Sequence, residues 1–123
     1  MSKPKSILLV EDYEGFRNSL KQLLELEGYV VIEAETGEQA LELAQQTTLD
    51  LILMDLTLPG MDGLSATKKI KEIPGSKSVP VIALSAYDAE DFRNDAKMAG
   101  CTDYITKPID FDHFTQILKQ LFA

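Results

Sequence analysis

Residues 51–63 read LILMDLTLPGMDG, and this stretch decides the fold. Four consecutive apolar residues, 51–54, precede a lone carboxylate, Asp55, and a proline–glycine turn follows shortly after it. An apolar run without alternation is typical of a strand that is buried on both faces of a parallel sheet. The sequence therefore predicts a central strand that ends on Asp55 and carries its carboxylate to the edge of a sheet.

Similar apolar runs lie on both sides of this stretch, at residues 7–10, 29–32, 79–84 and 104–105. The last run is short, as expected for an edge strand. Between the runs, apolar residues recur with the period of an amphipathic helix. Strands that alternate with helices predict a parallel sheet with helices on both of its faces.

Capping residues mark the expected ends of several helices. Thr36, followed three residues later by Gln39, forms a capping-box pattern, and Gly28 is a typical C-terminal stop. Asp88 and Asp110 are the expected N-caps of the fourth and fifth helices. The inward faces of these two helices are expected to carry Phe92, Ala96, Ala99, Phe114, Ile117, Leu118, Leu121 and Phe122.

The length and charge of the chain limit the classes of function. Its 123 residues fit a single domain, which we expect to span residues 1–123. The net charge of −8 disfavours direct binding to nucleic acid or to an anionic membrane and suits protein or cation partners. The single cysteine, Cys101, excludes an intramolecular disulfide and fits a reducing compartment. Without a signal-peptide pattern or a bilayer-spanning segment, we expect a cytoplasmic protein that does not insert into membranes.

Polar side chains follow the apolar runs where the predicted strands end. They are Glu11 and Asp12 after the first run, Asp55 after the third, Ser85 after the fourth and Lys107 after the fifth. In an open parallel sheet, ligands bind outside this edge of the strands. Three acids, one hydroxyl and one amine should therefore meet in one site. Carboxylates crowded in this way repel one another unless a cation lies between them.

These residue types predict a divalent cation and phosphoryl chemistry. Oxygen ligands with few carboxylates favour Mg²⁺, for which Mn²⁺ can substitute, over Ca²⁺. Asp55 is the candidate nucleophile, because a carboxylate can accept a phosphoryl group and form an aspartyl phosphate. Ser85 would donate a hydrogen bond to one phosphoryl oxygen, and Lys107 would contact another as a point charge.

With these residues in place, the chain resembles the receiver domain of two-component response regulators, in particular the single-domain chemotaxis regulators. The matching residues are Glu11-Asp12, Asp55 within DLTLPGMDG, Ser85-Ala86, Tyr104 and Lys107-Pro108. The resemblance covers the whole chain, with five motifs in register. It implies an α/β fold of the (βα)₅ flavodoxin-like type, a three-layer sandwich around a five-stranded parallel sheet in the order 2-1-3-4-5.

The resemblance also implies a role for each site residue. Asp55 would be the phosphoacceptor. Mg²⁺ would be bound by the carboxylates of Glu11, Asp12 and Asp55 and by the backbone carbonyl of Thr57. The first acid is Glu where many relatives have Asp, and this change should still allow a water-mediated metal contact. The phosphoryl donor would be a phosphohistidine on a sensor histidine kinase or on a histidine phosphotransfer protein.

Further residues would couple phosphorylation to a partner. Ser85 and Tyr104 would form a switch pair, in which Ser85 moves to the phosphoryl group and Tyr104 turns inward behind it. The face built from the fourth helix, fifth strand and fifth helix would then bind a downstream target. Thr57 and Tyr87 occupy positions that tune the lifetime of the phosphorylated state, and Tyr87 is expected to hinder attacking water. The Lys107–Pro108 bond is expected to be cis.

Two other classes of protein share features of this site. A phosphatase of the haloacid dehalogenase type also places a nucleophilic aspartate after an apolar strand, but it needs an acid two residues later, where this chain has Thr57. A pseudo-receiver keeps the fold and binds a partner without phosphorylation, although such modules usually lack the acid pair, the acceptor or the lysine. We expect a receiver that catalyses only its own phosphorylation and dephosphorylation and is not otherwise an enzyme.

Overall fold

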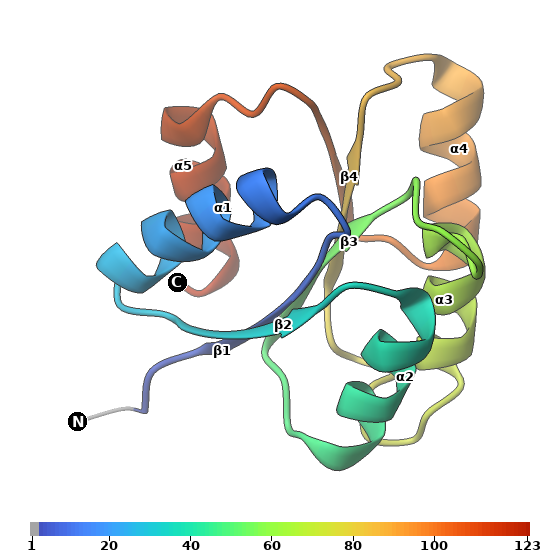
Figure 1. Cartoon of the computed structure of the whole chain (residues 1–123), viewed down its shortest axis with the longest axis horizontal. Helices are drawn as coiled ribbons and strands as arrows, with labels where there is room; N and C mark the ends of the chain where they lie inside the picture. Colours follow the sequence, from blue (N-terminus) through green and yellow to red (C-terminus); the bar gives the residue numbers. More distant parts are fainter. Residues whose placement is uncertain (1–2) are drawn as a thin grey trace.

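The computed structural model describes residues 3–123, in which five strands alternate with five helices (Figure 1). The strands are β1 (Ser6–Val10), β2 (Val30–Ala34), β3 (Leu51–Asp55), β4 (Val81–Ser85) and β5 (Asp103–Thr106). The helices are α1 (Glu14–Leu26), α2 (Gly37–Gln46), α3 (Gly63–Lys71), α4 (Glu90–Ala99) and α5 (Phe111–Leu121). All neighbouring strands pair in parallel, in the order β2-β1-β3-β4-β5. The predicted fold class and strand order are confirmed.

Helices cover both faces of the sheet: α1 and α5 lie on one face, and α2, α3 and α4 lie on the other (Figure 1). Successive side chains of a strand point to opposite faces, so each central strand contributes to two cores. In β3, Ile52 and Met54 pack with residues of α2 and α3. Leu51 and Leu53 pack with residues of α1 and α5. All four side chains are fully buried, which explains why the run before Asp55 is apolar without alternation.

The predicted caps of α2 and α5 are present. The Thr36 side chain accepts a hydrogen bond from the N–H of Gln39 at 3.1 Å, and Asp110 accepts one from the N–H of His113 at 3.2 Å. Such caps satisfy backbone donors that the first turn of a helix leaves free. Gly28 adopts a φ of 96° just after α1, a conformation that glycine reaches without strain.

The prediction that Asp88 caps α4 is wrong. The N-cap of α4 is Ala89, and no side chain caps this end of the helix. Asp88 Oδ1 instead accepts hydrogen bonds from Arg93 Nε at 2.8 Å and from Thr106 Oγ1 at 3.1 Å. A charged guanidinium is a stronger hydrogen-bond donor than a backbone amide, so the carboxylate turns toward Arg93. The hydrogen bond from Arg93, followed by that from Thr106, lowers the pKa of Asp88.

The expected inward position of Phe92 on α4 is also wrong. Ala96 and Ala99 are buried as predicted, but the Phe92 side chain is 43% exposed. Its ring stacks on the ring of Tyr87, with 4.9 Å between the centroids. Both rings are partly exposed and line the cavity next to Ser85, so the large apolar side chain contributes to the surface near the site rather than to the core.

Lys5, near the beginning of the described chain, and Phe122, near its end, lie side by side at the edge of the sheet opposite the carboxylates. Lys5, just before β1, places its Nζ 5.6 Å from the centroid of the Phe122 ring, just after α5. The same ring packs against Tyr29 at a centroid distance of 5.6 Å. Within residues 3–123, the structure contains no helix that combines the length and the apolar character needed to cross a membrane.

Candidate functional site

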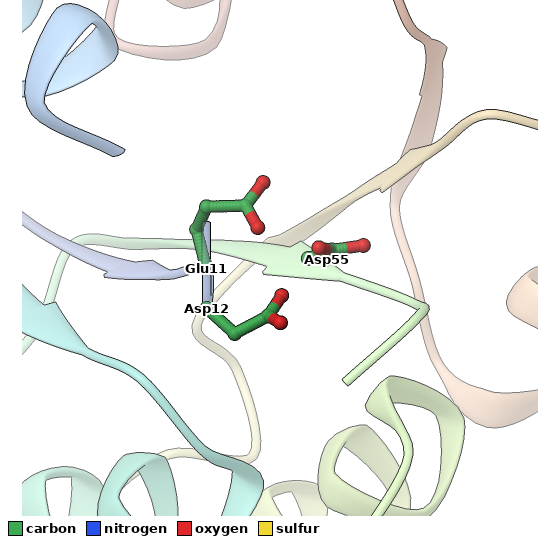
Figure 2. Close-up of side chains that lie close together, drawn as sticks. All are labelled: Glu11, Asp12 and Asp55. Atoms are coloured by element: carbon green, nitrogen blue, oxygen red, sulfur yellow. The ribbon is translucent and has the colours of Figure 1, made fainter. Parts of the chain in front are cut away.

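The structure brings Glu11, Asp12 and Asp55 together at the carboxyl edge of the sheet (Figure 2). Glu11 and Asp12 directly follow β1, and Asp55 is the last residue of the neighbouring strand β3. Each residue offers a carboxylate oxygen, and these oxygens lie within 4.8 Å of one another. Glu11 and Asp55 are buried, whereas Asp12 is exposed. The cluster is therefore reached from solvent on the side of Asp12.

Lys107 supplies the positive charge next to this cluster. Its Nζ lies 2.7 Å from Glu11 Oε1 and 3.3 Å from Asp55 Oδ2. Burial lowers the pKa of Lys107, but the hydrogen bond with Glu11 and the charges of both carboxylates outweigh this effect and raise the pKa overall. Nζ also lies 4.7 Å from the centroid of the Phe16 ring. The peptide bond between Lys107 and Pro108 is cis, as the resemblance implies.

The position of the Asp55 carboxylate is set by the loop that follows it. Asp55 is 3% exposed, and its Oδ1 accepts a hydrogen bond from the N–H of Thr57 at 2.9 Å. The start of α3 packs directly on this strand end. A Cβ atom built on Gly63 would lie only 2.3 Å from the carbonyl oxygen of Asp55 and 2.7 Å from the Cα of Leu56. Only glycine allows this close approach of helix and strand.

Glu11 is the most constrained of the three acids. Its N–H donates to the carbonyl of Ala34 at 3.0 Å, and its Oε2 accepts from the N–H of Tyr13 at 3.1 Å. Burial, followed by the hydrogen bond with Asp55, raises the pKa of Glu11, although Lys107 and the Tyr13 amide act in the opposite direction. The single positive charge of Lys107 does not balance the three carboxylates, so the cluster has excess negative charge. This set of oxygen donors fits Mg²⁺.

We expect Glu11→Gln to stabilise the protein at neutral pH in EDTA. Since folding raises the pKa of Glu11 above 4.5, its contribution to stability is most favourable below that value and is lost as the pH rises through the folded pKa. Free energies of unfolding from urea titrations of both proteins should therefore converge in acid and diverge at neutral pH. A difference that does not change with pH would contradict the raised pKa.

The predicted switch residues meet at Tyr87, beside the acidic cluster. Ser85 ends β4, and its buried hydroxyl accepts a hydrogen bond from the N–H of Tyr87 at 3.0 Å. The hydroxyl of Tyr104, on β5, donates to the carbonyl of Tyr87 at 2.5 Å. Arg93 lies over the Tyr104 ring, 4.8 Å from its centroid. A cavity of about 230 Å³ opens next to Ser85. It is lined by Leu56, Thr57, Asp62, Leu64, Ser85, Tyr87 and Phe92.

Arg17, on α1, belongs to this region although it was not predicted from the sequence. Its side chain is almost entirely buried and donates to the backbone carbonyl of Glu11 at 3.0 Å. A signal was available, because Arg17 lies three residues before Leu20 and seven before Leu24, on the stripe that faces the core. A basic residue on such a stripe needs buried acceptors, which the helix pattern alone does not identify.

Comparisons with known proteins agree with this geometry. Residues 7–119 match the family described as the response regulator receiver domain. The chain belongs to this family. It is 38% identical to the polar-differentiation response regulator DivK of Brucella anthropi over 116 residues, which cover 94% of each chain. The predicted membership among receiver domains is confirmed.

Two solved structures are similar over nearly the whole receiver domain. The first is the receiver domain of the sensor histidine kinase PA1611 from Pseudomonas aeruginosa, with 34% identity and a TM-score of 0.90 over 98% of this chain and 100% of that one. That structure has a magnesium ion coordinated in its active site cleft. The second is the chemotaxis protein CheY4 of Vibrio cholerae, with 25% identity and a TM-score of 0.92 over 97% and 99% of the two chains.

Proposed function

We propose that this receiver domain accepts a phosphoryl group on Asp55 and uses the added charge to change its binding to a partner protein. The observation that carries the proposal is the buried Asp55 carboxylate, with Lys107 Nζ at 3.3 Å and the carboxylates of Glu11 and Asp12 beside it. The magnesium ion in the cleft of the PA1611 receiver domain supports a divalent cation at the corresponding acids.

The phosphoryl donor is a phosphohistidine on a sensor kinase or a histidine phosphotransfer protein. A carboxylate oxygen of Asp55 forms a bond to phosphorus while the bond between phosphorus and the histidine nitrogen breaks. The electron pair leaves with the imidazole, and because its other ring nitrogen carries a proton, neutral histidine remains on the donor. Lys107 lies beside the acceptor carboxylate and contacts a phosphoryl oxygen after transfer. Positioning and charge neutralisation supply most of the catalysis in such transfers.

Glu11, Asp12, Asp55 and the backbone carbonyl of Thr57 are the groups that would hold Mg²⁺, or Mn²⁺ in its place. When bound, the cation neutralises charge on the oxygens of the transferring group. The chain itself keeps these groups in place: Lys107 and the Tyr13 amide each hold one oxygen of Glu11. The Thr57 amide holds one oxygen of Asp55 and leaves the other toward Lys107.

The signal would leave through the face formed by α4, β5 and α5. Phosphorylation adds a charge of about −1.5 to −2 at neutral pH, which attracts the hydroxyl of Ser85. When Ser85 moves to the phosphoryl group, the hydrogen bond from the N–H of Tyr87 to its hydroxyl breaks. Because the carbonyl of Tyr87 accepts from Tyr104, a movement of Tyr87 also reaches β5. A target protein that prefers the new shape of this face shifts the population toward it.

The phosphoacceptor site around Asp55 suits a protein that catalyses its own phosphorylation and dephosphorylation only. Its kinase and target would be met in the cytoplasm. The net charge of −8 disfavours direct contact with nucleic acid. The downstream target is therefore taken to be another protein.

Intact-mass measurement tests the proposal directly. The wild-type protein is incubated with acetyl phosphate and Mg²⁺, and a single phosphoryl adduct is expected that EDTA prevents. Beryllofluoride, which mimics the phosphoryl group on a carboxylate, should bind in the same conditions. A protein that shows neither the adduct nor beryllofluoride binding would contradict phosphorylation and favour a pseudo-receiver that binds its partner without phosphate.

Mg²⁺ should stabilise the folded protein, because it binds a cluster that the unfolded chain does not form. At a free concentration of about 100 times Kd, the expected gain in the free energy of unfolding is about 2.7 kcal/mol. Asp12→Asn should lose most of this gain at the same concentration. Thermal unfolding with and without Mg²⁺ measures the effect. The control is Asp62→Asn, which removes a nearby carboxylate outside the cluster and keeps a good N-cap for α3.

Tyr87→Ala should shorten the lifetime of the phosphorylated state several-fold. The Tyr87 ring lines the cavity next to Ser85 and stacks on Phe92. We expect the ring to limit the approach of water to Asp55. The measurement is the decay of the phosphorylated mass after the donor is removed. Tyr87→Phe keeps the ring and should decay like the wild type. Equal decay rates for Tyr87→Ala and the wild type would show that the ring does not shield the site.

A further inference from the structure

Arg17 connects three parts of the protein behind the acidic cluster. It is only 7% exposed, although it carries a full charge. Its Nη1 donates to the backbone carbonyl of Glu11 at 3.0 Å, between β1 and α1. Nε and Nη2 donate to Glu33 and Glu35, on and just after the edge strand β2, each at 3.2 Å. The planar guanidinium satisfies these three acceptors from one side chain, which an ammonium group cannot do in the same geometry.

These contacts fix the backbone on both sides of Asp12. The Arg17 side chain holds the carbonyl of Glu11, and its backbone N–H donates to the carbonyl of Tyr13 at 2.9 Å. The N–H of Glu11 is bound by Ala34 at 3.0 Å. Asp12 lies between these fixed points and is itself exposed. The direction of its carboxylate therefore depends on the peptide unit that Arg17 holds.

The charge of Arg17 is compensated away from the cluster. Its two ion pairs are with Glu33 and Glu35, and Glu33 also pairs with Lys21 at 3.2 Å. Arg17 reaches Glu11 through the backbone carbonyl and leaves its carboxylate to Lys107. The contribution of Arg17 to the acidic cluster is thus geometric, because its charge is already matched.

We propose that Arg17 is a positioning residue of the cation site, which acts through the Glu11 carbonyl to orient Asp12. The inference rests on the proposed function, since it concerns the cation that the proposed transfer requires. Partners of this kind, one step removed from the metal, typically change metal affinity by about 10-fold to 100-fold when they are mutated. Arg17 differs from the site residues in that it touches neither the cation nor the phosphoryl group.

The direction of the change in Mg²⁺ affinity distinguishes a role of Arg17 in positioning Asp12 from an effect of its charge. Removal of a positive charge near a cation site strengthens cation binding by Coulomb's law. Loss of positioning weakens it. Arg17→Lys keeps the charge and loses the planar donor set, and Arg17→Met loses both. Lys21→Met is the matched control, because it removes a charge that pairs with the same Glu33 and leaves the loop contact intact.

Isothermal titration calorimetry measures Kd for Mg²⁺ well below the unfolding temperature, with circular dichroism to show that each variant is folded. Arg17→Lys should bind Mg²⁺ about 10-fold more weakly than the wild type. Lys21→Met should bind it as tightly as the wild type or slightly more tightly. If Arg17→Met does not fold, Arg17→Lys decides the question. A wild-type Kd in folded Arg17→Lys would overturn the proposal.

A second readout is the Mg²⁺ dependence of phosphorylation by acetyl phosphate. In Arg17→Lys the half-saturating Mg²⁺ concentration should rise as Kd does, while the rate at saturating Mg²⁺ stays close to that of the wild type. A fall in the saturated rate with no change in half-saturation would contradict a role in cation positioning. If the wild type binds Mg²⁺ but forms no adduct, the proposed function fails and the calorimetric comparison still decides the role of Arg17. A wild type that binds no Mg²⁺ would overturn both.

Discussion

Asp55→Asn is expected to abolish the phosphoryl adduct formed with acetyl phosphate and Mg²⁺, and to leave the fold intact. The amide has the shape of the carboxylate, so its oxygen can still accept the hydrogen bond from the N–H of Thr57. It has no anionic oxygen to attack phosphorus. It also removes one of three crowded acids, so the variant should unfold in EDTA at no lower a temperature than the wild type.

The matched control for this loss is Asp62→Asn. Asp62 lies in the same loop and accepts from the N–H of Ser65 at 2.9 Å as the N-cap of α3, a role that Asn fills well. This variant should form the adduct like the wild type. Intact mass, followed by peptide mapping, locates the phosphoryl group. An adduct of wild-type yield in Asp55→Asn would place the acceptor elsewhere, whatever its effect on stability.

Gly63→Ala is the substitution with the largest expected effect on stability, a loss of about 3 kcal/mol in the free energy of unfolding. The added Cβ would lie 2.3 Å from the carbonyl oxygen of Asp55 and 2.7 Å from the Cα of Leu56. Both are backbone atoms of the β3 end, which cannot move aside as a flexible side chain can. Either α3 or the strand end must shift, and the loss of packing extends through both.

Gly75→Ala is the control for a change from glycine to alanine as such. A Cβ on Gly75 would meet nothing within 4 Å, so this variant should gain up to about 1 kcal/mol from a less flexible unfolded chain. Urea titrations followed by circular dichroism measure both variants. If Gly63→Ala is as stable as the wild type, the close packing of α3 on the end of β3 does not constrain the fold.

Most of the fold and the centre of the site could be predicted from local sequence patterns. The apolar run before Asp55 has no alternation because β3 is covered on both faces, and burial of this kind is visible in the sequence itself. The acids at the ends of β1 and β3 meet because parallel strands bring their carboxyl ends to one edge. These conclusions require only the type and order of the elements.

The features that could not be predicted depend on contacts between distant segments. Arg17 is buried because Glu33 on β2 and Glu35 just after β2 accept its hydrogen bonds, and no pattern within α1 reveals these acceptors. Asp88 does not cap α4 because its carboxylate accepts hydrogen bonds from Arg93 and Thr106 instead. In both cases the tertiary arrangement decides which groups the side chain contacts.

The contact between Lys5 and the Phe122 ring has a practical consequence for engineering. Since the beginning and the end of the described chain are neighbours, a short linker could join them, and a circular permutant could be opened in a surface turn such as that at Gly75. Lys5 precedes the start of β1, whereas Asp55 is at the end of the parallel strand β3, so this pair lies at the opposite edge of the sheet from Asp55. A fluorescent reporter joined near Lys5 or Phe122 would therefore lie away from the acidic cluster, and the protein could be followed in living cells.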